Sequence, residues 1–414
     1  MTETAQLGDA GWLKADAVAR LLGLLNRDGE EARVVGGAVR NALMQLAVAE
    51  IDVATTAAPE EVVRRVAAAG LKAKPTGIEH GTVTVIIDGR PFEVTTLRRD
   101  VETYGRKAKV VFGRDWSEDA QRRDFTINAL SATADGKVYD YVGGIADIAA
   151  RRVRFIGEPS TRIAEDYLRI LRFFRFHAWY GTGPVDAAAL HACILARAGL
   201  ETLSRERVRM ELLKLVVAPH ATPTLVVMAE TGLLGTVLGG VPQLASFENV
   251  TKVEAATGMA ADAVRRLGAL AVAVKEDGER LAQRLRLSNA EAERLLALER
   301  WWRVSPSCGE AAAHALLYRD GPQFFADRVL VAWSRSAAGA ADRSWHDLAN
   351  LPRRWTAPDF PLKASDFTRR GIAAGPALGA VMRAAEAAWI AADFPSERGT
   401  LDSIADRAAK GIGA

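Results

Sequence analysis

Two acidic residues near the start of the chain, Glu50 and Asp52, have the spacing of a metal-binding pair. In a β-strand the side chains alternate between two faces, so carboxylates at these positions would point the same way. Neighbouring carboxylates repel each other unless a cation lies between them, and oxygen ligands of this kind suit Mg²⁺. The spacing therefore predicts a magnesium site at Glu50 and Asp52.

A glycine pair upstream, Gly36 and Gly37, predicts a phosphate-binding turn. Residues 33–35 are typical of a short strand, and residues 38–46, which lack Gly and Pro, are typical of a helix that begins at this turn. A helix start offers unpaired N–H groups and the positive end of the helix dipole, and Arg40 lies in the first turn. Alone, a glycine pair is usually only a turn and an acid pair usually a solvated strand face, but their order and proximity favour a functional site.

The same residues resemble a known signature. The run Gly-Gly-Ala-Val-Arg at residues 36–40, followed by Glu-Ile-Asp at residues 50–52, is similar to the motif of class II nucleotidyltransferases, which include bacterial tRNA CCA-adding enzymes and bacterial poly(A) polymerases. The chain departs from this pattern twice: Asn41 stands where the family usually has Asp, and Glu50 stands where its first metal-binding Asp is expected. The resemblance is specific across about residues 30–215 and general beyond them.

The resemblance implies a catalytic set of three carboxylates, Glu50, Asp52 and Glu93, with two Mg²⁺ ions held by the first two. The ions would activate an RNA 3′-hydroxyl and stabilise the pyrophosphate that leaves. Glu93 lies in a strand-like run over residues 92–97, between apolar neighbours. An acid in that setting can equally be an outward-facing residue with no further role.

A second motif lies at residues 122–130. On a helix, Asp124 and Asn128 would share one face because they are four residues apart. Such residues can form a surface salt-bridge cluster, but the run is also similar to a family motif in which Arg and Asp hold the triphosphate and the ribose. The resemblance implies the following set for those two groups: Gly36, Gly37, Arg40, Arg122, Arg123, Asp124 and Asn128.

A helix predicted over residues 165–180 carries Asp166, Arg169 and Arg172 at intervals of three. By itself this pattern is typical of an amphipathic helix with internal ion pairs. The run also resembles the motif with which class II enzymes select nucleotides without a template. Cytosine and adenine each present an amine donor beside a ring-nitrogen acceptor, so Asp166 and Arg169 would accept both, whereas U and G would leave these groups unpaired at about 1–3 kcal/mol each. Arg207, in a loosely matching motif, would brace this helix.

The chain of 414 residues exceeds one ordinary hydrophobic core, so several domains are expected. We predict an α+β fold. A nucleotidyltransferase head with a small mixed or antiparallel sheet would occupy residues 1–155, a helical neck with the base-reading helix residues 156–220, and a helical body and tail for tRNA binding residues 221–414. The polar residues 98–116 indicate a mobile surface loop, and the adjacent Trp301 and Trp302 indicate core.

Composition limits the classes of protein to which the chain can belong. The net charge of +3 permits binding to nucleic acid without requiring it. The two cysteines cannot build a disulfide framework, and the scattered histidines give no phosphohydrolase metal pattern. No signal sequence and no apolar run of membrane-spanning length occurs, so we expect a cytoplasmic protein with no membrane contact and no evident protein partner.

The favoured hypothesis is template-independent addition of C, C and A to the 3′ end of tRNA from CTP and ATP, with release of pyrophosphate. The helical half would contact the acceptor and T arms of tRNA through phosphates. Two alternatives stay open. A poly(A) polymerase would use the same head to add AMP to RNA 3′ ends, and a non-catalytic RNA-binding relative would fit the changes at Asn41 and Glu50.

Overall fold

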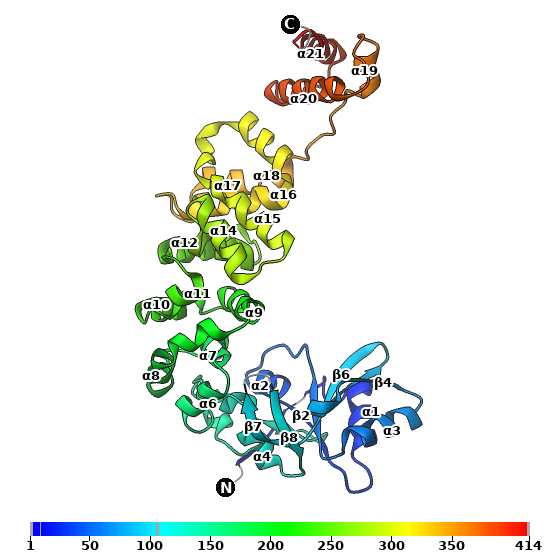
Figure 1. Cartoon of the computed structure of the whole chain (residues 1–414), viewed down its shortest axis with the longest axis vertical. Helices are drawn as coiled ribbons and strands as arrows, with labels where there is room; N and C mark the ends of the chain where they lie inside the picture. The colour runs from blue at the N-terminus through cyan, green and yellow to red at the C-terminus, as the bar shows by residue number, and fades with distance from the viewer. Residues whose placement is uncertain (1–2, 9, 105–106, 412–414) are drawn as a thin grey trace. The chain divides into compact units, whose positions relative to one another are not determined.

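The computed structural model describes residues 3–8, 10–104 and 107–411 of the chain (Figure 1). The chain divides into two compact units, with the boundary between Val237 and Leu238 at the end of helix α11 (Leu233–Leu238). The first unit contains every strand of the described residues, and the described part of the second unit is helical. The predicted α+β class is confirmed.

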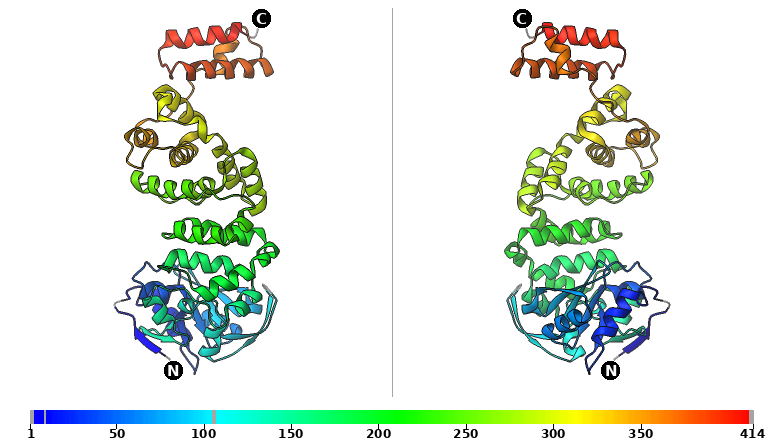
Figure 2. Two further views of the ribbon diagram at one scale, coloured as in Figure 1. Left: turned by 90° about the vertical axis from the view of Figure 1, so that its left-hand side faces the viewer. Right: turned by 90° about the vertical axis from the view of Figure 1, so that its right-hand side faces the viewer.

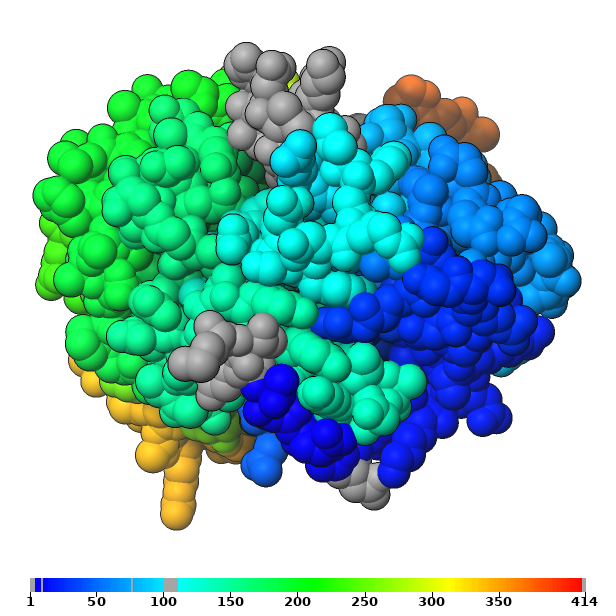
Figure 3. Space-filling model, turned by 90° about the horizontal axis from the view of Figure 1, so that it is seen from below, coloured from blue at the N-terminus to red at the C-terminus, as the bar shows by residue number. Residues whose placement is uncertain are grey.

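Eight strands of the first unit form one mixed sheet in the order β1, β10, β9, β2, β3, β6, β5, β4. Among the described strands of this sheet, β3 and β6 are the parallel pair and the other neighbours are antiparallel. At one edge the first strand lies against β10 (Figure 3). The strands are β1 (Glu3–Gln6), β2 (Ala32–Val35), β3 (Asp52–Thr55), β4 (Lys72–Gly77), β5 (Thr82–Ile87), β6 (Arg90–Thr96), β9 (Ser131–Ala132) and β10 (Lys137–Asp140).

A row of buried valines forms the centre of this sheet. In β5 every second residue is buried, and Val83 pairs with Val94 of β6, which pairs with Val53 of β3. Helix α3 (Pro59–Ala68) packs against β5, and α1 (Asp16–Leu25) packs against α3 and β2. Each fully buried valine contributes about 1.5–3 kcal/mol, so the row fixes the register of the strands that carry the acids.

The prediction of a loop over residues 98–116 is wrong. The strands β7 (Arg98–Tyr104) and β8 (Lys107–Phe112) form a separate antiparallel pair, followed by helix α4 (Trp116–Gln121). The two strands satisfy each other's backbone N–H and C=O groups, which a polar segment does as well as an apolar one. The ring of Phe112 packs against Gly81, where a Cβ would lie 2.7 Å from it. Residues 105 and 106 lie outside the described residues.

The remainder of the first unit is helical and frames the predicted nucleotide-reading segment. Helix α7 (Leu168–Tyr180) packs against α9 (Arg205–Val216) and α10 (Ala221–Glu230), as layers that Figure 2 shows from two sides. Phe173 and Phe174 of α7 are fully buried. The other helices of this unit are α2 (Gly37–Leu43), α5 (Gly144–Ala149), α6 (Pro159–Glu165) and α8 (Ala187–Leu195).

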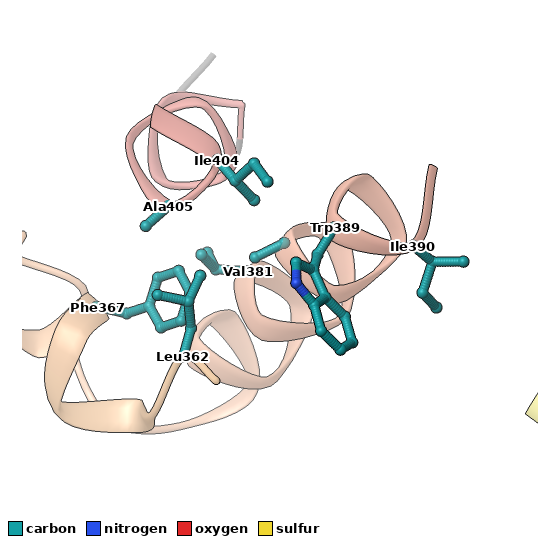
Figure 4. Close-up of a cluster of buried hydrophobic side chains, with 8 residues drawn as sticks. Leu362, Phe367, Val381, Trp389, Ile390, Ile404 and Ala405 are labelled. Carbon is teal, nitrogen blue, oxygen red and sulfur yellow. The ribbon is translucent and has the colours of Figure 1, made fainter. Parts of the chain in front are cut away.

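The second unit ends in three helices with an apolar cluster of their own. Phe367, Val381 and Ile404, from three successive helices, meet in this cluster (Figure 4). The helices of the unit are α12 (Leu244–Thr257), α13 (Ala263–Ala271), α14 (Lys275–Leu285), α15 (Asn289–Ala297), α16 (Glu310–Ser334), α17 (Arg343–Ala349), α18 (Leu351–Arg354), α19 (Ala364–Thr368), α20 (Pro376–Ala391) and α21 (Arg398–Lys410).

The tryptophan pair of the second unit is divided between interior and surface. Trp301 is half-buried and donates its indole N–H to the carbonyl oxygen of Ala273 at 3.2 Å. Trp302 is 62% exposed, and the Arg303 guanidinium lies 4.8 Å from its ring centroid. The prediction that both rings are core is wrong for Trp302, because adjacent residues of a short 3₁₀ turn (Leu298–Arg303) project in different directions.

Candidate active site

The glycine turn and two of the acids meet at one edge of the sheet. Val35, the last residue of β2, pairs with Asp52, the first residue of β3, and Asp52 pairs with Glu93 of β6. Because β2 is antiparallel to β3 and β6 is parallel to it, the end of β2 and the beginnings of β3 and β6 lie at the same edge. Adjacent strands are about 4.8 Å apart, so Gly36, directly after Val35, lies next to Asp52.

Glu50 reaches this edge from outside the strand. Strand β3 begins at Asp52, so the side-chain alternation that predicted two parallel carboxylates does not apply to Glu50. Glu50, Asp52 and Glu93 nevertheless line one cavity of about 590 Å³. The structure therefore gathers the three predicted acids around a common space.

The three acids repel one another in this arrangement. Asp52 is exposed, but partial shielding by the surrounding protein raises its pKa, as do the neighbouring Glu93 and Glu50, while Arg123 opposes the rise. Among the described residues, none of the three acids has an ion-pair partner. Like charges without a fixed counter-ion favour the binding of a cation.

Gly36 adopts a backbone conformation that side chains rarely allow, with φ 67° and ψ −121°. Helix α2 begins at the next residue. A Cβ on Gly36 would lie 3.5 Å from Nη1 of Arg123, and a Cβ on Gly37 would lie 3.6 Å from Nη2 of Arg40. Two guanidinium groups therefore flank the turn that the sequence predicts to bind phosphate.

Arg40 is buried, and its hydrogen-bond partners among the described residues are all neutral. Nη1 donates to Oδ1 of Asn128 at 2.5 Å, Nη2 to the hydroxyl of Tyr180 at 2.8 Å, and Nε to Oδ1 of Asn41 at 3.1 Å. The guanidinium also stacks on the Tyr180 ring, 3.9 Å from its centroid. Burial lowers the pKa of Arg40. A buried cation with neutral partners favours the binding of an anion beside it. The contact with Tyr180, the last residue of α7, also joins Arg40 to that helix.

Asp119 of α4, which the motif analysis missed, holds both arginines of the second motif. Its Oδ1 accepts from Nη2 of Arg122 at 2.7 Å, and its Oδ2 accepts from Nη2 of Arg123 at 3.2 Å. Burial opposes the charge of Asp119, but the two guanidiniums hold its pKa below the usual range. Arg122 also donates to the carbonyl oxygen of Arg98 at 3.1 Å, so it faces the β7–β8 hairpin while Arg123 faces the glycine turn. Arg122 and Arg123 follow Asp119 by three and four residues, a spacing that could have indicated both ion pairs from the sequence.

Asp124 and Asn128 lie close together, although not on the helix that the sequence predicted. Helix α4 ends before them, and Asn128 belongs to a 3₁₀ turn (Thr126–Asn128) from which its Nδ2 donates to Oδ1 of Asp124 at 3.4 Å. Oδ2 of Asp124 accepts from Nε and Nη2 of Arg172 at 2.7 and 2.5 Å. Burial opposes the charge of Asp124, but Arg172 holds its pKa below the usual range. Arg172 thus joins α7 to the head.

The helix predicted over residues 165–180 is broken at Asp166. Helix α6 ends directly before it, Asp166 is extended with φ −158°, and α7 begins at Leu168. Oδ1 of Asp166 accepts from the backbone N–H of Leu168 at 3.1 Å, a capping bond that favours a new helix start. The ring of Tyr167 packs on Gly199, where a Cβ would lie 2.1 Å from it.

The predicted base-reading side chains have internal partners. Nη2 and Nη1 of Arg207 donate to the Asp166 carboxylate at 2.5 and 3.2 Å, which is the bracing contact expected from α9. Arg169 donates to the carboxylate of Glu165 and, at 2.7 Å, to the carbonyl oxygen of Arg162. Each of the two predicted base-reading residues therefore forms an ion pair with a neighbouring side chain of opposite charge.

Two protein-family models match the chain. One, described as the Poly A polymerase head domain, matches residues 32–154, and the other, described as a probable RNA and SrmB-binding site of polymerase A, matches residues 186–248. The chain is 32% identical over 397 residues to the CCA tRNA nucleotidyltransferase 1, mitochondrial, of Mus musculus, across 94% of this chain and 89% of that protein. The Danio rerio protein of the same name is 34% identical over 381 residues, 91% and 87% of the two chains. The chain belongs to the CCA tRNA nucleotidyltransferase family.

The family fold extends over the whole chain. The crystal structure of the Bacillus stearothermophilus CCA-adding enzyme in complex with CTP matches with a TM-score of 0.76 and 25% identity, across 96% of this chain and 98% of that one. The CCA-adding enzyme of Leuconostoc citreum is 40% identical, but over 210 residues that make up 50% of each chain. The match of fold to the first enzyme thus covers nearly twice as much of this chain as the sequence match to the second.

The carboxylates of this family member fit Mg²⁺ as a partial ligand set. In the part of the chain that the structure describes, no three Asp, Glu, His or Cys side chains are close enough to hold an ion by themselves. Mg²⁺ usually keeps several waters and takes one or two protein carboxylates together with substrate phosphates. Asp52 with Glu50 or Glu93 at the cavity supplies such a set, and the raised pKa of Asp52 reflects a charge that a cation would offset.

Proposed function

We propose that this protein adds C, C and A to the 3′ end of tRNA from CTP and ATP and releases pyrophosphate. The observation that carries the proposal is the register of Val35, Asp52 and Glu93 across three neighbouring strands, which sets two acids beside the glycine turn. Family membership supports it, because the relatives are named for CCA addition. Solved structures with the same fold include CCA-adding enzymes in complex with CTP, with ATP and with tRNA.

The catalytic group consists of Glu50, Asp52 and Glu93. Two Mg²⁺ ions, held by Glu50 and Asp52, would supply positive charge to the attacking RNA 3′-oxygen and to the leaving pyrophosphate when bound. Glu93 keeps the negative potential at Asp52 high, since it is the strongest of the two charged neighbours that raise the Asp52 pKa. The same negative potential that favours a proton on Asp52 would attract a divalent cation, which would displace that proton when bound.

The triphosphate and ribose are assigned to the edge of the head nearest the glycine turn. The N–H groups of Gly36 and Gly37 and the guanidinium of Arg123 would contact the phosphates, with Arg40 adding charge from its buried position. Asp124 and Asn128 would hold the ribose hydroxyls, and Arg122 would support Arg123 through their shared partner. The closeness of both guanidiniums to the turn supports this assignment.

The base is assigned to Asp166 and Arg169, with Arg172 placing α7 against the head. Their internal partners, Arg207 and Glu165, keep both readers ordered before a nucleotide binds. C or A would take over or share these hydrogen bonds, whereas U or G would disturb them without replacement. An unpaired buried group costs about 1–3 kcal/mol, so each reader contributes to selection.

Each of the three segments predicted from the sequence has its own proposed role. Residues 1–155 would carry the chemistry and residues 156–220 the nucleotide reading, and residues 221–414 would contact the acceptor and T arms of tRNA. A family model described as a probable RNA-binding site reaches residue 248, which supports RNA contact at the start of the last segment. Such contacts are mainly to phosphates, so affinity should fall steeply with salt.

The cytoplasm is the proposed compartment. Cys193 and Cys308 are both free, which suits a reducing environment, and burial raises the pKa of Cys193 to about 12. The animal relatives are named as mitochondrial proteins. Within the described residues, no helix has the length and apolar character needed to cross a membrane.

A tRNA that lacks its terminal C, C and A, supplied with CTP and ATP, tests the proposal. We expect extension by those three nucleotides and then a stop, and CTP alone should give addition of two C residues. Unlimited addition of A would identify a poly(A) polymerase instead. Binding of tRNA without any extension would identify a non-catalytic relative, and Glu50→Asp would then show whether the longer acid had disabled the site.

A further inference from the structure

The cavity beside the acids has a lining that the assigned roles do not use. Glu50, Asp52 and Glu93 line it, and neither glycine of the turn does. The rest of its wall includes the half-buried indole of Trp12 and the exposed guanidinium of Arg90. Its volume of about 590 Å³ lies within the range of about 300–1,000 Å³ for small-molecule sites.

The order of the strands places Arg90 beyond the acids as seen from the glycine turn, while Trp12 reaches the same cavity from the segment before α1. Strand β2 leads into the turn and pairs with β3, which begins at Asp52; β3 pairs with β6, which begins at Arg90 and carries Glu93. The neighbour of β6 on its other side is β5, where Thr84 is the register partner of Glu93 and lines the same cavity. Across the sheet edge, the acids thus lie between the turn and Arg90.

This order matters because phosphoryl transfer is directional. The attacking and leaving oxygens lie roughly in line on opposite sides of the reacting phosphorus. With the triphosphate at the glycine turn, pyrophosphate leaves on the β2 side and the attacking 3′-oxygen arrives from the β6 side. The group that carries the attacking oxygen is the last nucleotide of the accepting RNA.

We infer that Trp12 and Arg90 form the subsite for that last RNA nucleotide, which rests on the proposed function. The Trp12 indole offers a face on which either C or the base preceding the CCA end can stack, since every base has an aromatic face. Arg90 offers an exposed charge to the phosphate of the same nucleotide. The incoming nucleotide is read elsewhere, by Asp166 and Arg169 of the neck, so the two bases are held by different parts of the first unit.

Steady-state kinetics with separate variation of RNA and CTP test this subsite. Trp12→Ala should raise the KM for RNA roughly 5- to 100-fold, because it removes one base-stacking contact. The KM for CTP should stay within about two-fold of its wild-type value. Trp12→Phe should restore most of the RNA affinity. Arg90→Ala should also raise the KM for RNA and reduce the slope of log affinity against log salt by about one. Arg20→Ala, an exposed position of α1 outside the cavity, is the matched control and should change neither KM.

A photoreactive RNA end provides a readout that needs no variant. A tRNA ending in 5-iodocytidine, irradiated with the wild-type protein, should form a cross-link within the peptide that contains Trp12. A cross-link to a different peptide, or an unchanged KM for RNA in Trp12→Ala, overturns the subsite while extension by the wild-type protein continues. Failure of the wild-type protein to extend tRNA would overturn the proposed function itself, so the two failures are distinguishable.

Discussion

Two charged sites of the molecule, the acids at the cavity of the first unit and a buried ion-pair cluster of the second unit, differ in how their charges are matched. In the first unit, Asp52 lies beside two further acids, and Arg40 is buried among neutral partners. In the second unit, Glu254 and Asp327 are more deeply buried, with 1% and 2% of their surfaces exposed, but each has two arginine partners. Asp52 therefore differs from Glu254 and Asp327 in the sign and number of the charges around it, and not only in how deeply it is buried.

The matched cluster of the second unit is centred on Arg265. Its Nη1 lies 2.8 Å from Glu254 and its Nε 3.0 Å from Asp327, and the two carboxylates are completed by Arg266 and Arg294 at 2.7 Å each. Asp262, 2.9 Å from Arg294, is the third carboxylate of this cluster, so three acids match three arginines and join α12, α13, α15 and α16. The three acids at the cavity lack such partners among the described residues, so a bound cation would offset their charge. The difference concerns the proposed catalytic acids, which lack ion-pair partners among the described residues, whereas the predicted base readers Asp166 and Arg169 are paired, as the carboxylates of the cluster are.

The largest effect should come from neutralising the unmatched acid. Asp52→Asn should lower the rate of nucleotide addition at least about 10³-fold, a loss of roughly 4 kcal/mol of transition-state stabilisation, because it removes a proposed metal ligand. The same exchange should slightly raise the free energy of unfolding near neutral pH, since it removes repulsion from Glu93 and Glu50. Single-turnover extension and urea unfolding measure the two quantities.

Opposite changes in activity and stability distinguish a functional charge from a structural one. Asp52→Asn with a large fall in stability would mean that the carboxylate supports the fold, and unchanged transfer would refute its role in catalysis. Affinity for tRNA, measured by filter binding, should stay nearly intact, because the charge lies at the reaction centre rather than along the RNA backbone.

Breaking the matched cluster should have the reverse result. Glu254→Gln should lower the free energy of unfolding by about 3–5 kcal/mol, because it removes a buried carboxylate that pairs with both Arg265 and Arg266. Denaturant unfolding of the second unit measures this loss. The control is Glu248→Gln in the exposed pair with Lys252, on the same helix, which should change stability by less than about 1 kcal/mol. Equal effects of the two exchanges would contradict the distinction.

Much of this site followed from the sequence because it depends on local signals. The glycine turn, the strand before it and the acid at Asp52 were each predicted, and strand pairing then brought them together with Glu93. The pairing itself could not be predicted residue by residue, because it depends on buried valines of distant strands. Glu50 shows the limit: the strand begins after it, so its place at the cavity comes from the loop.

Most of the remaining differences between the predicted and the observed structure occur where one stretch of sequence is compatible with two local conformations. Asp166 could continue a helix or cap a new one, and the packing of Tyr167 against Gly199, a contact remote in sequence, accompanies the second outcome. Arg172 pairs with Asp124, which is remote in sequence, so spacing alone did not reveal this contact. Arg169 instead pairs with Glu165, four residues before it. Polarity was likewise a poor guide to the β7–β8 pair, which is held by its own backbone.

A cation should offset the unmatched charge in a pH-dependent way. The raised pKa of Asp52 means that its contribution to stability is present at acid pH and is lost as pH rises through that pKa, where the carboxylate forms and is repelled. Mg²⁺ binds the carboxylate form, so at 10 to 100 times its Kd it should stabilise the protein by about 1–3 kcal/mol near pH 7. Thermal unfolding with and without Mg²⁺ should show this gain shrink toward about pH 4. A gain that persists at acid pH, or in Asp52→Asn, would place the ion elsewhere.

The smallest expected effect comes from giving Arg40 the carboxylate that it lacks. Oδ1 of Asn41 already accepts from Nε and Nη2 of Arg40 at 3.1 and 2.8 Å, so Asn41→Asp would convert these into ionic hydrogen bonds. The exchange also removes the hydrogen bond from Nδ2 of Asn41 to the carbonyl oxygen of Ala47 at 3.0 Å, so the free energy of unfolding should rise by about 1 kcal/mol at most. Because the new charge offsets that of Arg40 beside the glycine turn, the KM for CTP should rise a few-fold in the extension assay. Higher stability with an unchanged KM would assign Arg40 to holding Tyr180 of α7 against the head rather than to the attraction of phosphate.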